Sequence, residues 1–257
     1  MTEHIYNLQP DPEDKNDFIF QTTRPPSVPL PLRMDLRNYC SPVRDQDGRG
    51  CCTGEAGVGL REFLAIKATG SYTPLSPIEL YKLELILELR FGQDAGANLR
   101  TTMKVLQHAG VCPEADNPFE KDKFNKLPTK KMLQNGLAWR IGPYHALNSL
   151  TDIHECLAAE NPIAIGFAVY ESFEGDTNLT KTGVMPMPEK GEKLLGYHAV
   201  LDVGYLTNPR YLGGGCEIIK NSWSKDWGDE GYFYMPWAYM TYKNIIARWT
   251  GTLPGRM

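Results

Sequence analysis

Apolar side chains change their spacing about halfway along the chain. In residues 52–64 they recur at the spacing of one helical face, which predicts a helix beginning at or near position 52. Residues 77–90 (PIELYKLELILELR) predict a second helix by composition and period. Residues 98–108 predict a third, which Gly110 and Pro113 end. The first half of the chain is therefore expected to be helical.

After about Gly136 the pattern favours strands. One short helix is expected at residues 151–160, with Thr151 or Asp152 as its N-cap. Apolar and partly β-branched runs then predict strands at residues 161–170, 198–206, 215–223 and 231–236. Helices followed by strands indicate an α+β fold or two packed subdomains.

This change of pattern divides the chain into three parts. We expect an N-terminal extension at residues 1–31, a helical subdomain at residues 32–136 and a β-rich subdomain at residues 137–257. The segment RPPSVPLPLR (residues 24–33) is rich in proline and is expected to be extended. A cleft between two such subdomains is a common place for an active site.

Composition and charge exclude several classes of partner. The 257 residues carry a net charge of −4, so neither a nucleic acid nor an anionic membrane is an expected partner. No apolar stretch approaches the ~20 residues of a membrane span, and the N-terminus does not resemble a secretory signal. The six cysteines form no Cys-x-x-Cys pair. We therefore expect a cytoplasmic protein without a metal or other cofactor; the oligomeric state stays open.

The segment DQDGRGCCTGEAG (residues 45–57) places two cysteines at the start of the first predicted helix. A helix N-terminus favours a thiolate, although a free cysteine is more often a small buried residue. His198 begins one predicted strand, Asn221 ends another, and Gln46 precedes the cysteines. Nucleophilic cysteine chemistry needs this set: a thiol, an imidazole, a group that orients it and a donor for the oxyanion.

Three sequence blocks carry a resemblance to a known family. SPVRDQ with GCCTGEA, GYHAVLDVGY and IIKNSWSKDWGDEGYFYM resemble the signature blocks of papain-like cysteine peptidases, and other pieces resemble bacterial members. The resemblance implies a helical subdomain and a barrel-like, β-rich subdomain with the active site between them. In the family the oxyanion glutamine precedes the nucleophile by six positions, which assigns Cys52 as the nucleophile and leaves Cys51 as a small buried residue.

The resemblance also implies roles for the other residues. Cys52 would attack a carbonyl as the thiolate, and His198 would protonate the leaving amine. Asn221 would hold the imidazole plane, with Trp223 shielding that hydrogen bond, and Gln46 would stabilise the oxyanion together with the Cys52 backbone N–H.

Substrate contacts follow from the same resemblance. Gly96 matches a position at which the family's backbone pairs with the substrate backbone, and only glycine lets another chain approach so closely. The pocket beside the scissile bond is expected near Asn98, Gly166 and Tyr197, and Trp223 is expected to contact the substrate as well. Tyr197 replaces a smaller residue that is more usual before the histidine.

Three functions remain open at this stage. The first is hydrolysis of peptide bonds through an acyl-enzyme thioester. The second is a papain-like acyltransferase that resolves the acyl-enzyme with an amine and forms an amide, so that the substrate is a peptide or an acyl thioester. The third is a non-catalytic papain-like binding module, which does not need all four of Gln46, Cys52, His198 and Asn221.

Two features depart from the family pattern. Thr53 stands where an aromatic residue is usual, and Glu55 on the first helical turn would raise the pKa of Cys52 if it lay close.

The N-terminal extension is expected to run along the outside, packing residues 18–20 against the β-rich half and leaving the cleft open. Deletion of residues 1–23 should then lower stability without raising activity. In the alternative, the extension lies in the cleft as an inhibitor.

Overall fold

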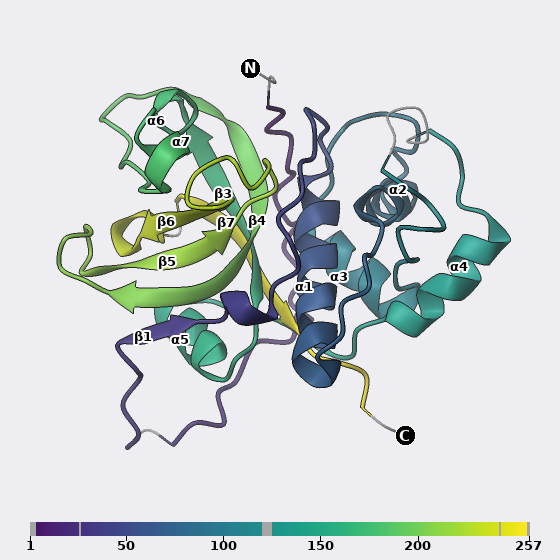
Figure 1. Ribbon diagram of the computed structural model, residues 1–257, viewed down its shortest axis with the longest axis horizontal. Helices are drawn as coiled ribbons and strands as arrows, with labels where there is room; N and C mark the ends of the chain where they lie inside the picture. The colour runs from purple at the N-terminus through teal and green to yellow at the C-terminus, as the bar shows by residue number, and fades with distance from the viewer. Residues whose placement is uncertain (1–3, 26, 120–124, 242, 256–257) are drawn as a thin grey trace.

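The computed structural model describes residues 4–25, 27–119, 125–241 and 243–255. Four helices pack on one side of the molecule and a twisted sheet lies on the other (Figure 1). The helices of the first half are α1 (Cys52–Thr69), α2 (Pro77–Leu87), α3 (Leu99–His108) and α4 (Lys130–Gly136). This arrangement of separate helical and sheet-rich halves is α+β, as the sequence predicts.

The sheet has seven strands, and every pair within it is antiparallel. Its order is β2-β7-β3-β4-β5-β6, and β1 pairs with β4 off this path. The strands are β1 (Arg33–Asp35), β2 (Tyr144–Ala146), β3 (Ile163–Tyr170), β4 (Leu194–Thr207), β5 (Gly215–Lys220), β6 (Tyr232–Pro236) and β7 (Ile245–Gly251). Three short helices connect them: α5 (Leu150–Ala158), α6 (Glu171–Gly175) and α7 (Leu179–Thr182). Three-residue 3-10 turns occur at Arg37–Tyr39, Leu137–Trp139 and Trp237–Tyr239.

Helix α1 is the central element of the fold. Its first thirteen residues are all buried, and it packs against α2, α3 and strand β4. One apolar core runs from α1 through β3, β4 and β7, with Leu60 and Phe63 on the helix and Trp249 on the last strand. The start of α1 is thereby fixed against the middle of the sheet.

The predicted elements differ from the structure at a few boundaries. The three predicted helices of the first half and the four predicted strands are present, and β4 begins four residues earlier than expected. The predicted N-cap of α5 is wrong. Ser149 caps this helix by accepting a hydrogen bond from the Asp152 N–H, while the Asp152 carboxylate accepts from the Ser149 N–H at 3.0 Å. Asp152 therefore completes a capping box from the third helical position.

Residues 18–20 of the extension lie along the edge of the sheet at β2. The Ala146 N–H donates to the Phe18 carbonyl and the Phe20 N–H donates to the Ala146 carbonyl, each at 2.8 Å. Contact with the sheet-rich half is thus as predicted. The side chains take a smaller part than expected, because Phe18 is 73% exposed and Ile19 is 43% exposed. The main chain holds this segment more than apolar burial does.

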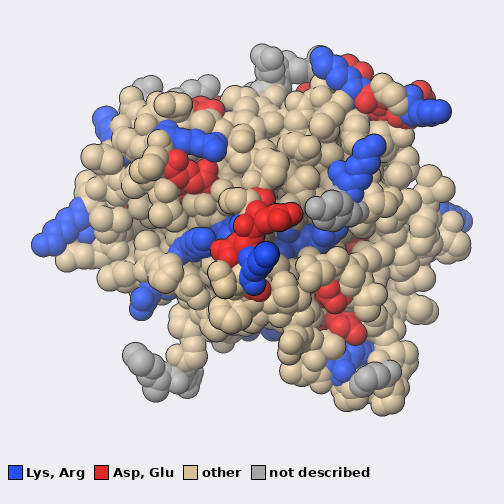
Figure 2. Space-filling model, turned by 180° about the vertical axis from the view of Figure 1, so that it is seen from behind, with Lys and Arg blue, Asp and Glu red and all other residues tan. Residues whose placement is uncertain are grey.

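Acidic and basic side chains are mixed on the face seen from behind, where neither sign forms one extended patch (Figure 2). This distribution matches the small net charge of −4. Among the described residues, no helix is both long enough and apolar enough to cross a membrane.

Candidate active site

A tight turn leads from Gln46 into helix α1, and the Gln46 side chain holds this turn together. Its Nε2 donates to the Arg49 carbonyl at 2.6 Å, and its Oε1 accepts from the Ser222 hydroxyl at 2.6 Å. The Gln46 backbone N–H also donates to the Ser222 carbonyl at 2.9 Å. Gln46 therefore joins the turn before the cysteines to the loop after β5.

The two cysteines differ in what surrounds them. Cys51 is the N-cap of α1 and packs in a small apolar cluster with Ile78, Tyr81 and Leu85. Cys52 is the first residue of α1, and the Ala199 backbone N–H hydrogen-bonds its sulfur, which lowers the pKa of Cys52 against a larger rise caused by burial. Cys51 is therefore a small buried residue, as predicted, and Cys52 lies beside the strand that carries His198.

His198, Asn221 and Trp223 come together as predicted. The His198 Nε2 lies 2.9 Å from the Asn221 Oδ1, and both residues are buried. The Trp223 ring stacks on the imidazole with 4.9 Å between centroids and 24° between planes. The His198 Nδ1 has no hydrogen-bond partner among the described residues. The amide and the indole thus fix the ring plane and leave one ring nitrogen available.

Two buried carboxyl groups lie near the start of α1. The charge of Glu55 adds to the rise that burial causes in the pKa of Cys51, and burial raises the pKa of Glu55 itself to about 7. Glu84 on α2 accepts a hydrogen bond from the Thr53 hydroxyl, and burial raises its pKa to about 8. Glu84 was not singled out from the sequence, because nothing in its helical pattern distinguishes a carboxylate that faces inward. Its bond to Thr53 gives a structural reason for threonine after the nucleophile position.

The site is covered by the chain itself. Residues 4–10, here called the covering segment, run in extended form between the sheet and α1 (Figure 1). The Tyr197 N–H donates to the Tyr6 carbonyl and the Leu8 N–H donates to the Tyr197 carbonyl, each at 3.2 Å. The Gln9 N–H donates to the Ala97 carbonyl at 2.9 Å. A peptide backbone is therefore bound from both sides of the site.

Aromatic contacts place one end of the covering segment directly over the catalytic candidates. The His4 ring stacks on Trp223 with 3.9 Å between centroids, and the Tyr6 ring meets His198 edge-on at 6.4 Å. A cavity of about 520 Å³ borders His4 and Trp223 at this end. The indole that stacks on His198 thus also contacts the covering segment.

Leu8 fills an apolar pocket in the β-rich half. It is only 2% exposed. A Cβ placed at Gly166 would lie 2.7 Å from the Leu8 Cδ2, and 3.3 Å from both the Ala247 Cβ and the Ile246 Cγ1. Glycine at position 166 therefore makes room for the leucine side chain. That a substrate side chain uses a pocket near Asn98, Gly166 and Tyr197 stays a prediction.

Gly96 and Asn98 have different roles in the structure. Gly96 adopts φ +69°, and a Cβ there would lie 1.9 Å from the Asn7 carbonyl oxygen, so a peptide backbone does approach at this point. Asn98 caps α3 by accepting from the Thr101 N–H at 2.9 Å, and its amide donates to Glu88 at 2.7 Å. The helix explains Asn98, and its contact with substrate stays a prediction.

A second attachment holds the extension just beyond the covering segment. The Arg100 guanidinium forms an ion pair with Asp17 and donates to the Pro12 carbonyl. Asp11 accepts from the Arg100 backbone N–H at 2.9 Å and from the Trp249 Nε1 at 2.6 Å. We call these four groups, Arg100, Trp249, Asp11 and Asp17, the Arg100 anchor. Because Arg100 is almost fully buried, the anchor is much less screened than a surface ion pair.

The expectation that the extension leaves the site open is therefore wrong. Residues 18–20 do follow the outer edge of the sheet, but the preceding residues turn inward and cover the site. The reason is that burial of Leu8, pairing with Tyr197 and Ala97, and the Arg100 anchor act together. None of these partners is near the extension in sequence.

Covering the site also changes its electrostatics. Burial lowers the pKa of His198 to about 4 and raises the pKa of Cys52 to about 12. Between these limits the thiol and the imidazole are both neutral, because a charged pair would have to form away from water. His4 adds to the effect by lowering the pKa of His198 further. In the covered form, burial therefore disfavours the thiolate of Cys52.

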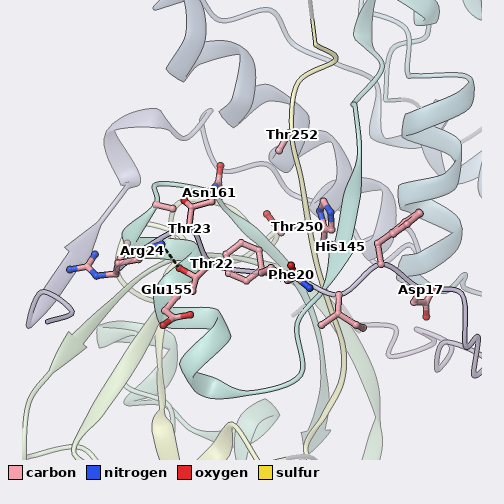
Figure 3. Close-up of a pocket in the computed structure, with 15 residues that line it drawn as sticks. Asp17, Phe20, Thr22, Thr23, Arg24, His145, Glu155, Asn161, Thr250 and Thr252 are labelled. Atoms are coloured by element: carbon pink, nitrogen blue, oxygen red, sulfur yellow. Dashed lines mark hydrogen bonds between the residues drawn. The ribbon is translucent and has the colours of Figure 1, made fainter. Parts of the chain in front are cut away.

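Farther along the extension, packing is loose. A cavity of about 820 Å³ lies between residues 17–24 and the edge of the sheet, where Phe20, His145 and Thr250 border it (Figure 3). The extension bridges this hollow instead of filling it. The buried side-chain contacts of the extension are therefore concentrated at the covering segment and the Arg100 anchor.

Comparison with known proteins gives a consistent result. A sequence model described as papain family cysteine protease matches residues 30–245. An uncharacterized peptidase C1-like protein of Acanthamoeba polyphaga mimivirus is 32% identical over 79% of this chain and 67% of its own length. Cysteine proteinase 2 of Zea mays is 28% identical over 82% of this chain, which spans 57% of the maize protein. The crystal structure of xylellain, a cysteine protease from Xylella fastidiosa, matches with a TM-score of 0.86 and 30% identity, covering 97% of this chain and 96% of xylellain.

With Cys52 beside the strand that carries His198, these likenesses define the molecule as a thiol hydrolase with an α+β fold of helical and β-rich halves. The chain belongs to the papain family of cysteine proteases. The resemblance found in the three sequence blocks is confirmed, and so is the fold class that it implied.

Proposed function

We propose that this protein hydrolyses peptide bonds through an acyl-enzyme thioester on Cys52. The observation that supports a peptide as substrate is the covering segment, which is itself a peptide bound by main-chain hydrogen bonds to Tyr197 and Ala97. In the reaction, the proton of the Cys52 thiol passes to His198, and the sulfur attacks the carbonyl carbon. The His198 proton then goes to the departing amine as the C–N bond breaks.

The remaining residues act on this sequence of steps. Asn221 holds the imidazole plane through its Oδ1, and Trp223 excludes water from that bond. Gln46 and the Cys52 N–H donate to the oxyanion, a contribution worth roughly 2.7–4 kcal/mol for one donor. Water then attacks the thioester, which releases the acid and restores the thiol.

A first prediction tests this route with a leucine-containing peptide ester, because an ester acylates more readily than an amide. Acid quenching followed by mass spectrometry should place the acyl group on Cys52, and a chase in buffer should release the free acid. If the thioester persists in water and reacts only with an added amine, the protein is an amide-forming enzyme instead. If no residue is acylated even in Leu8→Asp, which removes the buried leucine of the covering segment, the chain is a binding module.

A second prediction concerns the pocket that Leu8 occupies. Gly166→Ala places a Cβ within 2.7 Å of the Leu8 Cδ2, so the pocket becomes too short for leucine. For a pair of peptide esters that differ only in leucine or alanine at this site, kcat/KM for leucine should fall about tenfold relative to alanine. Gly175→Ala is the matched control, since a Cβ there meets no atom within 4 Å. An unchanged ratio would show that substrate side chains do not use this pocket.

A further inference from the structure

Two stretches of main chain meet the covering segment at the same residue. A Cβ at Gly50 would lie 2.2 Å from the Asn7 Nδ2, and a Cβ at Gly96 would lie 1.9 Å from the Asn7 carbonyl oxygen. Gly50 belongs to the turn that holds Gln46 and leads to Cys52. Gly96 belongs to the edge that binds the peptide backbone. Gly50 and Gly96 are far apart in sequence, so the distance between them in space must be fixed by contacts that other residues make.

A hydrogen-bonded bridge joins the two stretches. The Gly96 N–H donates to the Tyr81 hydroxyl at 2.9 Å, and this hydroxyl donates to the Asp94 Oδ1 at 2.7 Å. The other carboxylate oxygen, Oδ2, accepts from the Gly50 N–H at 3.0 Å. The bridge therefore runs without a break from the peptide-binding edge to the turn before the nucleophile.

Tyr81 is well suited to act as the fixed part of this bridge. It is fully buried on α2, and its ring packs in the cluster with Cys51 and Ala97. Burial, together with the charge of Asp94, raises the pKa of Tyr81, so the hydroxyl stays protonated and remains a donor. A phenol accepts and donates at one oxygen, which is what a link between an N–H and a carboxylate needs.

We infer that Tyr81 and Asp94 are positioning residues, which hold the peptide-binding edge at Gly96 in register with the turn at Gly50. This inference rests on the proposed function and deepens it. A peptide pairs with the edge at Gly96, while its reacting carbonyl must reach the oxyanion donors beyond Gly50. A small shift between the two would misplace that carbonyl, and misplacement of about 1 Å costs up to 10²-fold in rate.

The test compares two esters on the full-length chain. Para-nitrophenyl acetate reaches Cys52 but has no backbone to pair at Gly96, whereas the para-nitrophenyl ester of an acylated leucine peptide pairs along the edge. The covering segment must leave before either ester reacts, so its effect cancels in the ratio of the two kcat/KM values. Tyr81→Phe removes only the hydroxyl. Tyr239→Phe is the matched control, because its buried hydroxyl donates to the Ala168 carbonyl at 2.7 Å, away from the bridge.

We expect Tyr81→Phe to lower the peptide-to-acetate ratio about tenfold, with the acetate rate nearly unchanged. Asp94→Asn should lower it in the same direction, since the amide keeps only one acceptor oxygen for two donors. Tyr239→Phe should leave the ratio as in the wild type. A Tyr81→Phe ratio equal to that of the wild type, or a Tyr239→Phe ratio lowered as much, would overturn the inference.

A second measurement separates failure of the inference from failure of the proposed function. If neither the wild type nor Leu8→Asp, which removes the buried leucine of the covering segment, turns over either ester, the proposed function fails, and amide hydrogen exchange then decides on the bridge. Exchange at Gly50 and Gly96 should be faster in Tyr81→Phe than in the wild type and unchanged in Tyr239→Phe. Equal exchange in the wild type and Tyr81→Phe would overturn the bridge whatever the chemistry of the site.

Discussion

Cys52→Ala is expected to abolish turnover, while Cys51→Ala keeps most of it. Removal of the nucleophile leaves no group that can form the thioester, and in comparable hydrolases this costs on the order of 10⁴-fold or more in kcat. Cys51→Ala only trims a small side chain from the cluster of Ile78, Tyr81 and Leu85, so turnover should stay within a few-fold. Steady-state rates on the leucine peptide ester measure both variants.

The two thiols also differ electrostatically. Burial and the charge of Glu55 raise the pKa of Cys51 well above the ordinary value, whereas backbone N–H groups of Ala199 and Thr53 oppose the rise at Cys52. Iodoacetamide at neutral pH should therefore label Cys52 before Cys51, as read by peptide mass spectrometry. Selective labelling of Cys51 would contradict the assignment that the six-residue spacing from Gln46 supports.

The elements that carry the catalytic candidates could be predicted from sequence because their patterns are local. Helix α1 begins at Cys52 after a glycine-rich turn, and strand β4 is a long apolar run around His198. Strand β7 is not among the predicted strands, although it lies between β2 and β3. Its buried residues Ile245, Ala247 and Trp249 alternate with two partly exposed ones, but one of these, Ile246, is apolar and hides the alternation in the sequence.

The path of the N-terminal extension could not be predicted because its signal is entirely tertiary. The sequence HIYNLQP shows neither the apolar spacing of a helix nor that of a strand. Its acidic neighbours Asp11 and Asp17 look like ordinary surface residues. Their partners, Arg100 and Trp249, lie in α3 and β7. The apolar residues 18–20 favour burial of this part of the extension, but Phe18 is mostly exposed and Leu8 is the buried residue.

The Tyr81 bridge shows the same limit at the site itself. In the sequence, Tyr81 is one apolar position of a helix, and Asp94 is one acid in a loop. Only the fold brings the phenol between Gly96 and Asp94. Cys52, His198 and the Asn221 that orients the histidine could therefore be found from motifs, while Tyr81 and Asp94 could not.

Release of the covering segment is expected to activate the enzyme. Leu8→Asp places a carboxylate where an apolar side chain is only 2% exposed. The loss of leucine burial alone removes about 1.5–3 kcal/mol from the binding of the segment, and an unpaired charge adds to it. With the segment bound more weakly, turnover of the leucine peptide ester should rise at least tenfold. Leu32→Asp is the matched control, since this leucine directly follows the extension and is 73% exposed.

The same variant should change the pH dependence of Cys52. Burial is what raises the pKa of Cys52 to about 12 and lowers the pKa of His198 to about 4, so opening the site to water moves both toward their ordinary values. Alkylation by iodoacetamide at pH 7 should then be much faster in Leu8→Asp than in the wild type, with a bell-shaped pH profile for turnover. Arg100→Met removes the Arg100 anchor, which contains none of the catalytic candidates, and should have the same effects on alkylation and turnover. If both variants only lower the melting temperature and leave alkylation and turnover unchanged, the covering segment stabilises the fold without inhibiting the enzyme.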